Sequence, residues 1–271
     1  MEFDIFVVDA FTDQQFKGNS AAVVPVSEWP AESLMQNIAA ENNLSETAYI
    51  QLVEELTPAK QCYQIRWFSP LTEIDFCGHA TLASAKVLFD QNPALQQIEF
   101  VTQQVGRLTV AKGDNDTIVM SFPQRVPQAV DQVPTALTNG LSSPPMEVLL
   151  SEQAYFAVFA TAEEVEKIQY DSEQLKKLAP YDVVVTAKGE GDFDFVSRYF
   201  WPANGGDEDP VTGSIHAGLA PYWSQKLDKQ RLIAHQASKR GGVLHCELAG
   251  DRVIISGNAV VFMQGKISIK L

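Results

Sequence analysis

The apolar residues of this chain run together or alternate with polar ones in short stretches, a pattern typical of β-strands. Loop-forming glycine, proline and asparagine residues separate many of these stretches. Short helices are predicted after Pro30 to about Asn42 and over residues 162–168 and 172–178, where apolar residues recur at helical spacing. The predicted strands cover residues 3–11, 20–26, 47–53, 61–68, 98–102, 107–111, 117–122, 146–151, 154–159, 183–186, 193–201, 232–237, 242–248, 252–256 and 259–262.

Two further helices, over residues 78–89 and about 213–223, are apolar on almost every side. Lys86 is the only charged residue of the first. A helix without a polar face is buried, so we expect sheet to wrap around it. Pro221 is expected to kink the second helix or to end its first part at Ala220.

The segments that lead into these two helices resemble each other at a constant offset. Glu73 matches Glu208, since 208 − 73 = 135, and Cys77 matches Thr212, since 212 − 77 = 135. The offset is half of the 271-residue chain, which indicates an internal repeat. The fold class is therefore predicted as α+β, with two similar halves of mostly antiparallel sheet around a buried helix. The halves are expected at residues 1–122 and 146–271, with a proline-rich linker at 123–145.

The charge and the cysteines exclude several functional classes. A formal net charge of −14 disfavours nucleic acid and anionic membrane partners. Three dispersed cysteines without a CxxC pair argue against a disulfide framework and against a zinc site. The acidic N-terminus does not resemble a signal peptide, and no apolar run approaches the roughly 18 residues that span a bilayer. We expect a cytoplasmic protein without a bound metal. No GxGxxG follows the first strand and no P-loop is present, so neither nucleotide-binding fold is expected.

Glu46 is a candidate general base at a junction between helix and strand. Its position alone favours a solvated loop acid instead. If its side chain turns inward, loss of water raises the pKa of the carboxyl group toward the working pH, as a general base requires.

Three more candidates lie near the starts of the two buried helices. Asp209 precedes Pro210, where a carboxylate either caps backbone N–H groups or takes part in catalysis. Ser214 either packs or donates a hydrogen bond to a ligand. His79 is either structural or part of a site, and we expect a neutral imidazole because a helix N-terminus disfavours positive charge. Cys77 is interpreted as a small buried residue.

At these residues the sequence resembles the PhzF-like phenazine-biosynthesis isomerase family. The resemblance rests on Phe16-Lys17-Gly18-Asn19, Leu44-Ser45-Glu46-Thr47, Phe76-Cys77-Gly78-His79-Ala80-Thr81 and Glu208-Asp209-Pro210-Val211-Thr212-Gly213-Ser214. It covers essentially the whole chain. It implies the diaminopimelate-epimerase-like fold, with two pseudo-symmetric halves and a site between them, and a cofactor-free enzyme that is often a homodimer.

The resemblance also implies roles for individual residues. Glu46 falls on the family's catalytic glutamate, which shuttles the proton. His79, Asp209 and Ser214 fall on positions that hold and polarise the substrate. Gly78 and Gly213 fall in turns whose N–H groups receive a carboxylate. Ser20 departs from the family pattern, in which proline usually follows the Gly-Asn pair.

The preferred hypothesis is a cofactor-independent isomerase of a small carboxylated metabolite. One alternative is a small-molecule binding protein on the same scaffold. Another is a two-base epimerase that uses Glu46 and a second acid or thiol. Epimerases with this fold use two cysteines, and Thr212 occupies the second position here.

Overall fold

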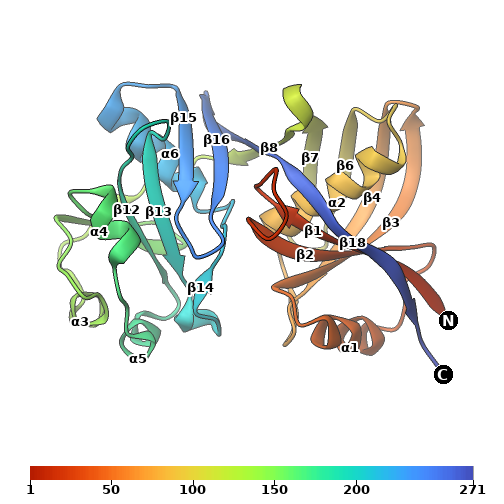
Figure 1. Ribbon diagram of the computed structural model, residues 1–271, viewed down its shortest axis with the longest axis horizontal. Coiled ribbons are helices and arrows are strands. Elements are labelled where there is room, and N and C mark those ends of the chain that lie inside the picture. The colour runs from red at the N-terminus through yellow and green to blue at the C-terminus, as the bar shows by residue number, and fades with distance from the viewer. Residues whose placement is uncertain (271) are drawn as a thin grey trace. The chain divides into compact units, whose positions relative to one another are not determined.

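The computed structural model describes residues 1–270, which form two compact units (Figure 1). Among the described residues, the first unit contains 1–121 and 256–270, and the second contains 122–255. This division differs from the predicted one at both ends. The last strand, Ala259–Ser268, belongs to the first unit because it pairs along its length with the first strand, Glu2–Ala10. The predicted linker belongs to the second unit, where Leu137 is fully buried in the core.

The first unit combines one buried helix, one covering helix and strands that are mostly antiparallel. Two of its strand pairs, β2 with β3 and β4 with β6, are parallel. In Figure 1 the dark blue strand β18 runs beside the red strand β1. The elements are β1 (Glu2–Ala10), β2 (Asn19–Val26), α1 (Glu32–Asn42), β3 (Glu46–Thr57), β4 (Lys60–Phe68), β5 (Glu73–Ile74), α2 (Gly78–Gln91), β6 (Gln97–Val101), β7 (Arg107–Lys112), β8 (Ile118–Pro123) and β18 (Ala259–Ser268).

The second unit again has one buried helix and mostly antiparallel strands, with three short helices in addition. Its parallel pairs are β11 with β12 and β13 with β15. The elements are β9 (Gln128–Ala129), α3 (Thr135–Gly140), β10 (Glu147–Leu150), β11 (Ala154–Val158), α4 (Ala162–Lys167), α5 (Ser172–Leu175), β12 (Asp182–Lys188), β13 (Phe195–Phe200), β14 (Glu208–Asp209), α6 (His216–Leu227), β15 (Arg231–Gln236), β16 (Gly242–Ala249) and β17 (Arg252–Gly257). Three short 3₁₀ turns cover residues 114–116, 176–178 and 202–204.

An ion pair marks the same place in both units. The Arg66 guanidinium donates Nε–H to Glu73 Oε1 at 2.7 Å in the first unit. In the second unit, Arg198 donates Nε–H to Glu208 Oε1, also at 2.7 Å. Each guanidinium also lies over a phenylalanine two residues further along its strand, 5.2 and 5.1 Å from the ring centres. The repeat inferred from the sequence is therefore present in the geometry of each unit. The short strands β5 and β14, which carry the two glutamates, were not predicted from the sequence.

Both predicted central helices are buried. Eleven of the fourteen residues of α2 are buried, and Lys86 is only partly exposed. The other helix, α6, begins at His216 rather than at residue 213 and continues through Pro221 to Leu227. Proline at position 221 cannot donate to the carbonyl of Ala217, four residues earlier. The backbone N–H of Arg125 takes that carbonyl instead, at 2.9 Å, so the helix continues without a buried unpaired acceptor.

Gly218 leaves α6 no room for a side chain, which yields a test of the packing. A Cβ atom at this position would lie 2.8 Å from the Arg125 carbonyl oxygen and 2.8 Å from Cζ of the buried Phe156. Gly218→Ala is expected to lower the free energy of unfolding by roughly 1–3 kcal/mol, despite alanine's helix preference. Urea denaturation would measure the change.

Gly265→Ala is the matched control, because no atom lies within 4 Å of a Cβ built at Gly265 in β18. An equal or smaller loss of stability in Gly218→Ala than in the control would contradict the close packing of α6.

Candidate active site

Glu46 and His79 form a buried contact in the first unit. Glu46 is the first residue of β3 and is 8% exposed, and His79 lies in the first turn of α2 and is 5% exposed. His79 Nε2 lies 2.9 Å from Glu46 Oε2. The distance between the two atoms is that of an ion pair. The angles at Glu46 Oε2 do not suit a hydrogen bond, so this buried oxygen has no hydrogen-bond partner. The inward-turned position of Glu46 agrees with the candidate role and excludes the solvated loop acid.

Asn19 and Cys77 surround the other side of the imidazole. Asn19 Nδ2 lies 3.1 Å from His79 Nδ1, and Ser45 donates its hydroxyl to Asn19 Oδ1 at 3.3 Å. Cys77 Sγ lies 3.4 Å from His79 Nδ1. Polar groups therefore fix the ring on the side away from Glu46 and orient Nε2 toward the carboxylate.

The electrostatics of His79 differ from the prediction of a neutral imidazole. Burial lowers the pKa of His79, but the neighbouring Cys77 and Glu46 raise it, and the net pKa lies well above 6.5. Burial also raises the pKa of the Cys77 thiol to about 11, so near neutral pH the thiol carries no charge. The Glu46 carboxylate is therefore the group that stabilises the imidazolium.

Glu46, Cys77 and His79 are also the residues of the described chain whose ligand atoms could hold a metal. Their ligand atoms all lie within 4.8 Å of one another. Sulfur, nitrogen and oxygen ligands of this kind suit zinc. The metal would have to displace the proton of Cys77, because the pKa of that thiol is raised. The sequence-based prediction of no metal remains a prediction.

Asp209 belongs to a separate network in the second unit. Thr212 donates its hydroxyl to Asp209 Oδ2 at 2.5 Å. Gln236 donates to the Asp209 carbonyl at 2.9 Å and accepts the Thr212 N–H at 2.8 Å. Thr212 occupies the repeat position of Cys77, and its hydroxyl here holds the carboxylate in place. Asp209 therefore does not cap α6, which begins seven residues later at His216.

Ser214 is bonded to residues that the sequence did not indicate. Gln153 donates from Nε2 to Ser214 Oγ at 3.0 Å and to the Tyr199 hydroxyl at 2.9 Å. Tyr199 donates to Asp182 Oδ2 at 2.6 Å. No local motif marks these residues, and only the strand register could have identified Asp182 as a counterpart of Glu46.

The six predicted site residues thus fall into two groups. Glu46, Gly78 and His79 lie together in the first unit, where Gly78 is the first residue of α2. Its N–H is among those that a helix leaves without an internal partner. Asp209, Gly213 and Ser214 lie in the second unit. Gly213 precedes α6 by three residues, and its carbonyl accepts the His216 N–H at 3.2 Å.

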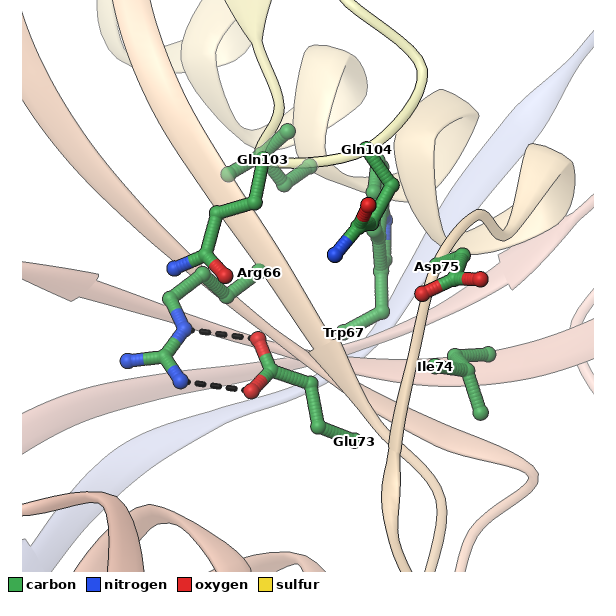
Figure 2. A pocket seen from close by; sticks show the side chains of 8 residues that line it. Arg66, Trp67, Glu73, Ile74, Asp75, Gln103 and Gln104 are labelled. Carbon is green, nitrogen blue, oxygen red and sulfur yellow. Dashed lines mark hydrogen bonds and ion pairs between the residues drawn. The ribbon is translucent and has the colours of Figure 1, made fainter.

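A separate cavity of about 180 Å³ opens beside the Arg66–Glu73 ion pair in the first unit. Figure 2 shows the guanidinium and the carboxylate side by side, with Asp75, Gln103 and Gln104 around the same space. Its lining contains neither Glu46 nor His79. The Glu73 carboxylate in this lining is already bound to Arg66, so the Glu46–His79 pair remains the candidate catalytic group. Among the described helices, none combines the length and apolar character needed to cross a membrane.

Comparisons with known proteins agree with this fold. The family described as phenazine biosynthesis-like protein matches residues 8–265. An uncharacterised isomerase from Pseudomonas aeruginosa is 43% identical over 271 residues, 99% of this chain and 100% of that protein. The crystal structure of a PhzF-family phenazine biosynthesis protein from Enterococcus faecalis has a TM-score of 0.91 and 43% identity, covering 99% of this chain and 100% of that chain.

A more distant structure shares the fold alone. A probable proline racemase from Agrobacterium radiobacter K84 has a TM-score of 0.60 at 10% identity, covering 99% of this chain and 93% of that chain. The predicted α+β class with epimerase-like halves is therefore confirmed.

Removal of the Glu46 charge tests the electrostatics of the pair. In Glu46→Gln the pKa of His79 is expected to fall, because the charge that favours imidazolium is gone. NMR titration of the histidine Cε1–H signals would measure it. The folded-state pKa lies above the ordinary value of 6.5. The pair's contribution to stability is therefore full below pH 6.5 and is lost as the pH rises through the folded-state pKa.

His216 provides an internal reference in the same titration, since burial lowers its pKa to about 4 independently of Glu46. An unchanged His79 titration in Glu46→Gln would contradict the assigned cause.

Proposed function

Because the chain belongs to the phenazine biosynthesis-like protein family, we propose that it is a cofactor-independent isomerase acting on a small carboxylated metabolite. The family match over residues 8–265 and the relatives named as isomerases support this proposal. In the proposed reaction a C–H bond breaks at one carbon and a C–H bond forms at another. The substrate keeps its electron pair, so no oxidant or reductant is consumed.

The observation that carries the proposal is the buried carboxylate of Glu46 with an unsatisfied oxygen. This Oε2 atom is screened from water and has no hydrogen bond of good geometry, so it can accept a proton from a bound substrate. Glu46 takes the proton from an activated carbon and returns it at the second carbon. General base catalysis of this kind contributes typically 10²–10⁴-fold to a rate.

His79 and the groups of the second unit complete the proposal. The imidazole next to Glu46 stabilises the carboxylate before it takes the proton and after it returns it, and polarises the substrate. Asp209 and Ser214 bind the substrate, and the N–H groups of Gly78 and Gly213 receive its carboxylate. A homodimer in solution, as the resemblance implies, remains a prediction.

The two alternative functions are less well supported. A binding protein would have no need of a buried glutamate held against a buried histidine, since taking two such groups out of water is costly. A two-base epimerase would need a second base. The neighbouring thiol, Cys77, does not suit that role because burial raises its pKa to about 11.

Glu46→Gln is the direct test of the proposal. Thermal shift with small aromatic and amino-acid carboxylates first identifies a ligand. NMR in deuterated water then follows solvent deuterium into that compound. We expect the parent protein to exchange and rearrange it, and Glu46→Gln to lose at least 10²-fold in rate while it keeps ligand binding, because the amide cannot accept the proton.

Glu54→Gln is the matched control, since Glu54 lies on the same strand but is exposed. Full exchange in Glu46→Gln would remove Glu46 from the mechanism. Exchange with inversion at one carbon, without migration of the proton to another, would favour the epimerase.

A further inference from the structure

The internal repeat assigns a counterpart in the second unit to Glu46. In the first unit, Glu46 on β3 pairs with Ala21 on the parallel strand β2. In the second unit, Asp182 on β12 pairs with Ala154 on the parallel strand β11. The neighbouring antiparallel strands agree with this register, because Thr47 lies opposite Phe68 and Val183 lies opposite Phe200. Both carboxylates are therefore the first residue of equivalent strands.

The two carboxylates reach the helix-entry segment of their unit by different routes. Glu46 contacts His79 directly, at 2.9 Å. Asp182 is shorter by one methylene group and reaches Ser214, the repeat counterpart of His79, through two intervening side chains. Tyr199 and Gln153 bridge the distance with bonds of 2.6, 2.9 and 3.0 Å. A direct contact in one unit thus corresponds to a hydrogen-bonded chain in the other.

The direction of each hydrogen bond in this chain is fixed by the groups available. Asp182 accepts the Tyr199 proton on Oδ2 and a proton from Asn204 Nδ2 on Oδ1, at 2.7 Å. Burial raises the pKa of Tyr199 well above 10, and the charge of Asp182 raises it further, so the phenol keeps its proton and donates it. The tyrosine oxygen then accepts from Gln153.

The amide nitrogen of Gln153 has two hydrogens, and both are committed. One goes to Tyr199 and the other to Ser214 Oγ. Because the serine oxygen already accepts this hydrogen, its own proton is left to donate. A half-buried hydroxyl held as a donor suits an anionic group on a ligand.

We propose that Asp182, Tyr199 and Gln153 are positioning residues that fix the Ser214 hydroxyl as a hydrogen-bond donor to the anionic group of the substrate. The proposal rests on the substrate-binding role proposed above for Ser214. Tyr199 is 3% exposed, and neither it nor Asp182 touches the substrate in this scheme. They act through Ser214 and save the cost of orienting its hydroxyl when the ligand binds.

The test is a double-mutant cycle between Tyr199→Phe and Ser214→Ala. Tyr199→Phe removes one hydroxyl and keeps the ring, and the rate of solvent deuterium exchange into the ligand found by thermal shift is measured. Each single variant is expected to lower kcat/KM roughly tenfold or more, the scale of one lost hydrogen bond. The double variant is expected to lose no more than Ser214→Ala alone, because without the serine hydroxyl there is nothing left to position.

Asp182→Asn is a second variant for the same cycle. It replaces one carboxylate oxygen by an NH₂ group, which cannot accept the hydrogen bond that Asn204 or Tyr199 donates to that position. Tyr155→Phe is the matched control, because Tyr155 lies in the same unit, packs on its core and takes no part in this chain. Circular dichroism confirms folding of each variant. Additive losses in the cycle, or a Tyr199→Phe variant as active as Tyr155→Phe, would overturn the proposal.

A measurement without ligand separates this proposal from the proposed function. The side-chain amide protons of Gln153 are followed by ¹⁵N NMR, and one of them is expected to shift upfield in Tyr199→Phe and the other in Ser214→Ala. Unchanged amide signals in both variants would overturn the hydrogen-bonded chain whatever the activity. Unchanged amide signals would not affect the conclusion drawn from Glu46→Gln about the proposed function. Deuterium exchange that persists in Glu46→Gln would likewise not affect the amide shifts on which the hydrogen-bonded chain is tested.

Discussion

A helix with no polar face must be enclosed by other elements, and each unit of this protein is arranged around one such helix. Eleven residues of α2 and eight of α6 are buried. Burial of apolar surface on all sides stabilises the fold by about 25 cal/mol per Å². Polar groups are therefore kept off the helix surface and gather in the segments that lead into each helix. His79 and Ser214 lie there, one in each unit. The position of the candidate chemistry therefore follows from the burial of the helices.

The two units keep the same framework but use it for different chemistry. The arginine–glutamate pair and the phenylalanine beneath each guanidinium recur with nearly the same distances. The groups at the helix entrance differ, with Cys77 and His79 in the first unit and Thr212 and Ser214 in the second. The first unit holds a buried carboxylate beside a histidine, whereas the second presents hydroxyls whose partners are fixed. The repeat thus separates the scaffold, which is shared, from the reactive groups, which are not.

Local patterns predicted most of the strands, both buried helices and the repeat, because hydrophobic periodicity and the 135-residue offset are visible in short stretches. They failed where distant segments pair. The last strand belongs with the first, and no local signal shows this. Glu46 and His79 were identified because family motifs mark them. Asp182, Tyr199 and Gln153 were missed because they come from two strands and a turn that are distant in the sequence and carry no motif, so only the register of the strands relates them.

The proline inside α6 has a consequence for the way the chain enters the second unit. Its missing N–H leaves the Ala217 carbonyl to the backbone of Arg125, three residues after the boundary between the units. An ordinary residue at position 221 would direct a second N–H group at the same oxygen, which here accepts from Arg125. The imino acid that ordinarily disrupts a helix here leaves the Ala217 carbonyl as the point where the segment between β8 and β9 attaches to α6.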